Sequence, residues 1–182
     1  MTTARIVIAV FLLQIFTFTA FLYSGFLPIG ADEEHGWFLH SILIILRENS
    51  IQRASSKITT PQSLPNPERV AAGGAHSETM CADCHLRPDR SSSEINTGLY
   101  PQPPNLTMTT GEKMESTAKR RFWVIKHGIK ASGMPAWGKS HDDEEIWNLV
   151  AFLQQLPGMS SDRYLQLTTQ HSHQHDQKQH NH

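Results

Sequence analysis

The sequence predicts a small all-α domain that is attached to one apolar amino-terminal helix. Three observations support this fold class: the first thirty residues carry a single charge, later segments place apolar residues at helical spacing, and no stretch alternates apolar and polar residues as a strand does. The 182 residues suffice for one ordinary domain with attachments. A formal net charge of -1 gives no reason to expect nucleic-acid binding.

An apolar stretch covers residues 6–29, which carry no formal charge. About 20 apolar residues span a bilayer as a helix, so residues 1–30 are predicted to form a transmembrane anchor. A cleaved signal peptide is the alternative, but this run exceeds the usual apolar core of about 7–15 residues, and no clear Ala-x-Ala site follows. Arg5 before the stretch and the acids from Asp32 to Glu34 after it place the amino terminus in the cytoplasm and the remaining chain outside.

Residues 31–65 form a connecting region with two parts. Residues 37–47, WFLHSILIILR, are apolar but too short to span a bilayer, and they predict a helix that lies at the membrane interface or packs against the anchor. Residues 54–67 have the Ser, Thr and Pro composition of a linker. The boundary of the following domain is therefore expected there.

Residues 66–158 form the predicted domain, whose first helix starts at Asn66. Asn66 is a favourable N-cap and Pro67 suits the first helical position. The helix runs into the two cysteines and contains the neighbours Gly73 and Gly74, each of which costs about 1 kcal/mol relative to alanine. This cost indicates that something packs closely against the helix at that point.

The rest of the domain contains a long loop and two further helices. Residues 86–106 carry four prolines and predict an irregular loop. Apolar residues at helical spacing predict a helix over residues 116–129. The last helix, over residues 140–156, has Ser140 or Asp142 as its cap, acids in its first turn and a Pro-Gly pair after its end.

The motif MCADCH contains the only two cysteines, Cys81 and Cys84, followed by His85. Two cysteines cannot form a disulfide-rich scaffold. A zinc site needs four ligands and normally a second Cys/His pair, and a thioredoxin-like dithiol needs a strand–turn–helix context; neither is visible in the sequence. Cys-x-x-Cys-His is the attachment signature of c-type haem, in which each thiol forms a thioether with one vinyl group. We therefore predict one covalent haem c on Cys81 and Cys84, with His85 as the proximal iron ligand.

Met134 is the predicted second axial ligand. It lies in the Gly/Pro-bounded segment SGMPAWGK, 49 residues after His85, which is enough chain to pass around the haem edge and return on the opposite face. His127 and His141 are alternatives, because haem with two histidine ligands also exists. His and Met ligands raise the reduction potential and suit electron transfer, whereas an open position permits catalysis.

Residues 66–156 resemble the class I, single-haem cytochrome c domain, and especially its membrane-attached bacterial type. The shared motifs are CADCH, the PPNL loop, GMPAW and the final helix DEEIWNLVAFLQQL. The resemblance implies a small all-α fold around the haem, in which the first and last helices cross and Phe152 of the last helix approaches Gly73 of the first. It also implies haem-pocket contacts from three residues: Pro104, Leu106 and Trp137.

The predicted function is the transfer of single electrons by a membrane-anchored carrier that has no catalytic residues. The expected partners are redox proteins of the same membrane, with a dehydrogenase or quinol-oxidising complex as donor and an oxidase or another protein as acceptor. The expected location is a bacterial inner membrane, with the domain facing the periplasm. A haem peroxidase or ligand-binding sensor is the alternative if Met134 does not bind the iron, and a metal-handling protein is another.

Residues 159–182 are predicted to form a disordered tail, and five of the eleven histidines fall in its last twelve residues. A solvated polar tail explains this composition. Alternatively, His171, His173 and His175 form a secondary metal site, because imidazoles at alternate positions can chelate Cu²⁺, Ni²⁺ or Zn²⁺.

Overall fold

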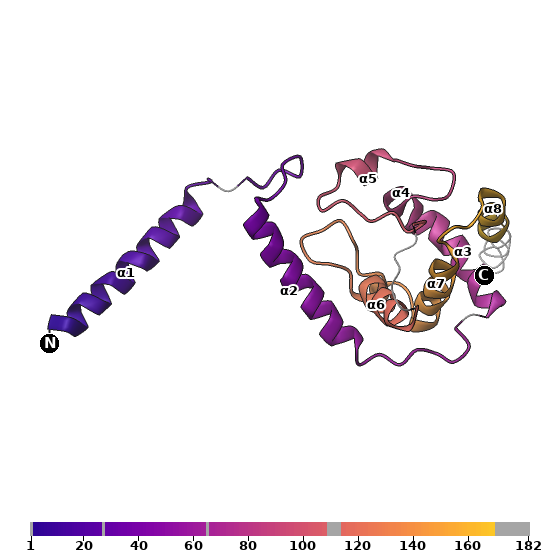
Figure 1. The fold of residues 1–182 in the computed structure, drawn as a ribbon, viewed down its shortest axis with the longest axis horizontal. Helices are drawn as coiled ribbons and strands as arrows, with labels where there is room; N and C mark the ends of the chain where they lie inside the picture. Colours follow the sequence, from indigo (N-terminus) through magenta and orange to yellow (C-terminus); the bar gives the residue numbers. More distant parts are fainter. Residues whose placement is uncertain (1, 27, 65, 109–113, 170–182) are drawn as a thin grey trace, which may run out of the picture. The chain divides into compact units, whose positions relative to one another are not determined.

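The computed structural model describes residues 2–26, 28–64, 66–108 and 114–169, and its regular elements in these ranges are helices (Figure 1). One isolated bridge pairs Arg87 with Arg90 in a turn. The chain divides into two compact units, Met1–Glu34 and His35–His182. The all-α fold class predicted from the sequence is therefore confirmed.

The first unit consists mainly of helix α1 (Thr2–Tyr23), which has 22 residues and a mean hydropathy of 2.3 over its most apolar window. Among the described residues it is the one helix that is long and apolar enough to cross a membrane. The Thr17 hydroxyl donates to the carbonyl oxygens of Leu13 and Gln14, at 3.0 Å each. The polar side chain is thus satisfied within its own helix, as an apolar environment requires.

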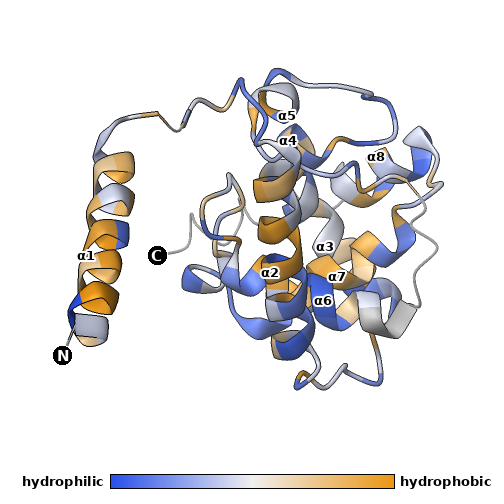
Figure 2. Ribbon diagram, turned by 60° about the vertical axis from the view of Figure 1, so that its left-hand side comes forward, coloured by the Kyte–Doolittle hydropathy of each residue, from blue (hydrophilic) through white to orange (hydrophobic). Residues whose placement is uncertain are grey.

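The second unit begins with helix α2 (Trp37–Ser55), which is longer than the expected helix over residues 37–47. Its amino-terminal part is apolar and its carboxy-terminal part is polar (Figure 2). The polar part packs on helix α6 (Met114–His127), where Glu48 forms an ion pair with Arg120 at 2.7 Å and Ile51 is buried. These tertiary contacts accompany a helix that continues past residue 47 into the first residues of the expected linker.

Helix α3 (Pro67–Met80) and helix α7 (Asp143–Gln155) pack against each other at Gly73. A Cβ atom on Gly73 would lie 2.0 Å from the carbonyl oxygen of Asn148, so only glycine fits there. Close packing at Gly73 was expected, but its nearest neighbour is the backbone at Asn148 and Leu149. Phe152, the expected partner, is fully buried and has its ring 5.9 Å from that of Tyr164.

The core is centred on α7, which packs against α3 and α6. Phe122 stacks on Trp147 with ring centroids 4.2 Å apart. The buried face of α7 consists mainly of large apolar residues: Ile146, Trp147, Leu149, Val150, Phe152 and Leu153. Asp142 caps α7 through its bond to the Glu145 amide, and the Glu145 side chain accepts from the Asp142 amide in return. This reciprocal cap fixes where the last helix predicted from the sequence starts.

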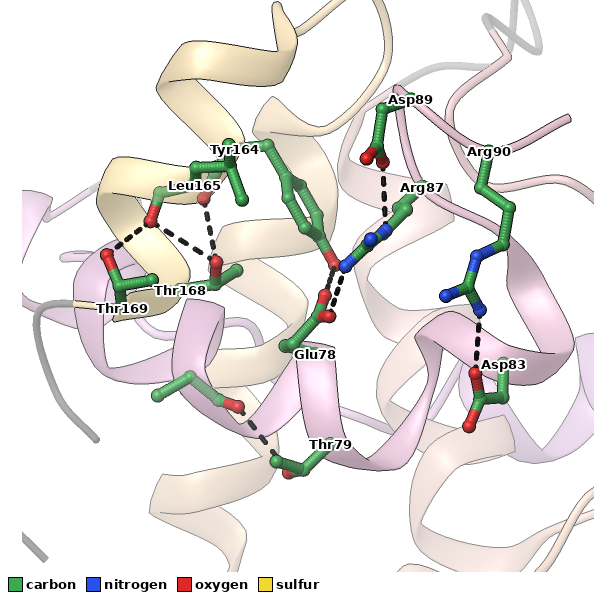
Figure 3. Close-up of polar contacts among 11 residues, drawn as sticks. Glu78, Thr79, Asp83, Arg87, Asp89, Arg90, Tyr164, Leu165, Thr168 and Thr169 are labelled. Carbon is green, nitrogen blue, oxygen red and sulfur yellow. Dashed lines mark hydrogen bonds and ion pairs between the residues drawn. The ribbon is translucent and has the colours of Figure 1, made fainter.

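The expected disordered tail begins instead with helix α8 (Ser161–Thr169), which packs on α3. Tyr164 is 2% exposed, and its hydroxyl donates to the Glu78 carboxylate at 2.6 Å (Figure 3). Glu78 also pairs with Arg87, and Arg87 pairs with Asp89 at 2.8 Å. Residues 161–169 of the expected disordered tail are therefore helical and packed. His171, His173 and His175 lie outside the described residues.

Candidate functional site

The two cysteines and the adjacent histidine share one helical turn. Cys81 ends α3, and Cys84 and His85 lie in the short helix α4 (Ala82–His85). The amides of Cys84 and His85 both donate to the Cys81 carbonyl, at 3.2 Å and 2.8 Å. Leu86, with a φ of 67°, ends the turn. The turn therefore holds two thiols and one imidazole within five residues.

His85 is oriented by the proline-rich loop. Its Nδ1 atom lies 2.9 Å from the Pro104 carbonyl oxygen, and its own carbonyl accepts from the Leu106 amide at 3.2 Å. Because a carbonyl only accepts, Nδ1 carries the proton, and Nε2 keeps the lone pair that binds a metal. Burial lowers the pKa of His85, and the bond to Pro104 opposes this shift only in part. The neutral imidazole is thus favoured, which is the form that ligates iron.

Burial also affects the first thiol. It raises the pKa of Cys81 to about 11, against a lowering contribution from a hydrogen bond with Ser77. The side chain is half-buried and packs against the apolar core. Both cysteines are free thiols in this structure. Cys81 therefore stays protonated at neutral pH.

Asn96 is a structural residue of the site that sequence reasoning missed. It is buried in helix α5 (Glu94–Gly98), within the loop that was expected to be irregular. Its Nδ2 group donates to the carbonyls of Cys84 at 2.6 Å and Pro103 at 3.0 Å. One side chain thus ties the cysteine turn to the residue before Pro104. The Ser-Glu pair that starts α5 was the available signal, because Ser93 caps this helix through the Asn96 amide.

Met134 lies in a tightly held turn. The Ile129 amide donates to the Met134 carbonyl at 3.2 Å, and the Met134 amide donates to the Ser132 hydroxyl at 3.1 Å. Gly128 has a φ of 65°, and a Cβ atom there would lie 2.8 Å from the Met134 carbonyl oxygen. The turn therefore needs a glycine at its start, and its backbone is fixed on both sides of Met134.

Four expected site residues pack against the main apolar core. Cys81, Leu106, Met134 and Trp137 are all partly buried and pack against the main core, and Trp137 starts the 3₁₀ helix η1 (Trp137–Lys139). Pro104 reaches the site through its carbonyl bond to His85. The cysteine turn, the proline loop and the methionine turn thus each place a side chain against the main core.

The two rival histidines have other neighbours. His127 is exposed at the end of α6, with its ring 5.1 Å from that of Trp123. His141 is half-buried and meets the rings of Trp137 and His76 edge-on, at 5.6 Å and 5.7 Å. Within the described ranges, three or more His, Cys, Asp or Glu side chains nowhere gather closely enough to hold a metal ion.

This donor set fits a covalently bound haem. Cys81 and Cys84 offer two thiols, His85 offers a neutral imidazole whose Nδ1 proton is already engaged, and Met134 carries a thioether on a separate turn. Cys81 and Met134 are also partly buried against apolar side chains of the core. The fit rests on side-chain chemistry and on the hydrogen bonds of the turn.

Residues 68–153 match the family model described as "Cytochrome C oxidase, cbb3-type, subunit III". The matched range begins in α3, ends in α7 and contains both the cysteine turn and Met134, whereas α1, α2 and α8 lie outside it. No curated protein and no solved structure matches this chain.

Proposed function

From the premise that residues 68–153 form a class I c-type cytochrome domain, whose family binds haem c covalently, we propose that this protein is a membrane-anchored, single-haem electron carrier. The observation that supports this proposal most strongly is the cysteine turn. It presents two thiols and a histidine whose Nδ1 atom is bonded to the Pro104 carbonyl. No catalytic side chain is required for such a carrier.

We assign the ligands as follows. Cys81 and Cys84 form the two thioethers, His85 is the proximal ligand and Met134 is the distal ligand. Bound haem c supplies one-electron redox chemistry at its iron. Burial keeps the imidazole of His85 neutral, and the bond to Pro104 fixes its tautomer. Met134 presents its thioether, and Leu106 and Trp137 exclude water. His/Met ligation and an apolar pocket both favour a raised reduction potential.

Helix α1 and the matched family support the location and the partners that we propose. Helix α1 anchors the chain in a bacterial inner membrane, with the cytochrome domain on the periplasmic side. The donor is a quinol-oxidising complex or a dehydrogenase, and the acceptor is an oxidase or another redox protein. The family description names an oxidase subunit, which supports an oxidase complex as the site of assembly or electron delivery.

The test is to produce the full chain in a bacterium with a c-type maturation system and to examine its membranes. We expect haem staining that survives denaturing electrophoresis, one haem per chain, and the far-red absorption band of Met–iron coordination. Met134→Leu removes this band and allows carbon monoxide to bind the reduced protein. Met159→Leu is the matched control, because Met159 is also half-buried against the core.

Two results would contradict the proposal. Haem that is lost on denaturation, or that persists after Cys81 and Cys84 are both replaced by Ser, would exclude thioether attachment by these residues. Carbon monoxide binding that is rapid in the unmodified protein would indicate an open iron position, and hence a sensor or peroxidase.

A further inference from the structure

The amino-terminal part of α2, residues 37–46, exposes an unusual amount of apolar surface. Trp37, Phe38, Ile45 and Leu46 each expose more than half of their area, and three further aliphatic side chains expose more than a third. The segment WFLHSILIIL contains no Asp, Glu, Lys or Arg. Figure 2 shows it as the apolar part of a helix whose other end is polar. We call residues 37–46 the apolar half of α2.

The apolar half of α2 is attached firmly to the cytochrome unit at both ends. Before it, the His35 amide donates to the Tyr100 hydroxyl at 3.1 Å, and the two rings meet edge-on at 5.1 Å. After it, Glu48 pairs with Arg120 of α6 and Ile51 is buried. Whatever the apolar half contacts therefore also sets the orientation of the unit that contains the cysteine turn.

The breadth of this surface indicates what covers it. At about 100° per residue, the exposed apolar positions of the segment occupy roughly two thirds of the helix circumference. Ile51, which is buried against the unit, lies outside this arc, and buried Ser55 lies at its edge, in the same direction as Trp37. A second helix would need only a narrow stripe with a period of 3.5 residues, whereas hydrocarbon accepts a broad apolar face.

The position in the chain supplies a second argument. Thirteen residues, 24–36, separate the end of α1 from the start of α2. Fully extended, they reach at most about 45 Å, so α2 starts within that distance of the point where α1 leaves the bilayer. The residues at the start of α2 are Trp37 and Phe38, and Trp is enriched at the interface between lipid and water.

We propose that the apolar half of α2 inserts into the interfacial layer of the same lipid bilayer that α1 spans. This inference rests on the proposed membrane anchoring by α1. The consequence is that the cytochrome unit does not rotate freely on a tether but is held with its α2 face against the lipid. The partner is the lipid surface itself, recognised through apolar area.

The test uses the full, haem-loaded chain in phosphatidylcholine nanodiscs, with nitroxide labels on single introduced cysteines. Cys81 and Cys84 do not react with the label because they are consumed as thioethers. The labelled variants are Leu46→Cys in the apolar half, Leu12→Cys in α1 and Leu165→Cys on α8. Leu165 is the matched control because it is an exposed leucine on a helix of the same unit. Relaxation enhancement by oxygen is compared with that by a water-soluble nickel chelate, against a nitrogen baseline that removes the contribution of the iron.

We expect the ratio of oxygen to nickel enhancement at residue 46 to exceed that at residue 165 several-fold and to approach that at residue 12. A lipid-like ratio at residue 12 with a water-like ratio at residue 46 would overturn the inference and leave the anchor intact. Protection of residue 46 from both reagents would also overturn it, because protein would then cover the surface. Dipolar broadening that disappears on dilution with unlabelled chain would identify that protein as a second copy. A water-like ratio at residue 12 would refute the membrane anchor itself.

Discussion

The hydrogen bond between Tyr164 and Glu78 joins α8 to the end of α3 that precedes Cys81, and its removal should measurably destabilise the fold (Figure 3). Tyr164→Phe deletes one hydroxyl and keeps the ring that packs near Phe152. A hydrogen bond to a charged acceptor contributes about 1.5–3 kcal/mol. Because Glu78 keeps its ion pair with Arg87, we expect a loss of about 2 kcal/mol in the free energy of unfolding. For a unit of this size, that corresponds to a fall of about 8 °C in Tm.

The same bond predicts a pH dependence. Burial raises the pKa of Tyr164, and the hydrogen bond and charge of Glu78 raise it further. A group whose pKa is raised on folding contributes stability that is fully present below its unfolded pKa, about 10 for tyrosine, and is lost as the pH rises toward the folded value. The difference in stability between the natural chain and Tyr164→Phe should therefore be constant near neutral pH and shrink above about pH 10.

The assay is denaturant unfolding of the haem-loaded chain in detergent, followed by far-ultraviolet circular dichroism between neutral and alkaline pH. Tyr23→Phe, at an exposed position of α1, is the control and should leave the midpoint unchanged. A loss below about 0.5 kcal/mol for Tyr164→Phe, or an identical alkaline decline in both chains, would refute the reasoning.

Three further predictions concern other contacts. Gly73→Ala forces α3 and α7 apart and should cost about 3 kcal/mol in thermal unfolding, whereas Gly98→Ala, which meets nothing within 4 Å, should be nearly neutral; equal effects would contradict the close contact. Asn96→Ala leaves the Cys84 and Pro103 carbonyls without this donor and should cost about 2–4 kcal/mol and shift the reduction potential; an unchanged potential would exclude a role in positioning His85. Burial raises the pKa of Glu48, but hydrogen bonds from Arg120 and Arg47 outweigh burial, so the pKa is lowered overall. The natural chain should therefore lose stability as the pH falls below about 4, and the Glu48→Gln variant should lose less stability over the same range.

Local chemistry explains which features could be predicted. The Asn66 cap, the Asp142 capping region and the Cys-x-x-Cys-His turn depend on neighbours within a few residues, so the sequence alone indicates them. Close packing at Gly73 could be predicted because glycine within a helix costs free energy. Which residue it faces depends on how α3 and α7 pack. Periodicity also placed α6 to within two residues at each end, because its buried face is apolar.

The features that were missed depend on partners far away in the chain. The polar half of α2 is helical because Glu48 meets Arg120, 72 residues later, and this pairing leaves no local pattern. Helix α8 has a short apolar face that packs on α3, and this contact with a distant segment could not be predicted from the sequence of α8 alone. Asn96 donates hydrogen bonds to the carbonyls of Cys84 and Pro103, and the sequence of the loop does not specify the backbone path that brings these carbonyls near Asn96. For the same reason, the sequence could nominate Met134, but it could not show the hydrogen bonds that hold its turn.

The adjacent glycines of α3 have a consequence for how fast electrons move. Gly73 admits the backbone of α7, and Gly74 admits the backbone of α8, where a Cβ atom would lie 2.7 Å from the Leu167 carbonyl oxygen. Backbone contacts have no rotamers to exchange, so the helix that ends in Cys81 is clamped on two sides by rigid neighbours. We expect the backbone at the end of α3, next to Cys81, to shift little when the iron of a bound haem changes charge. The reorganisation energy of each electron transfer would then be small.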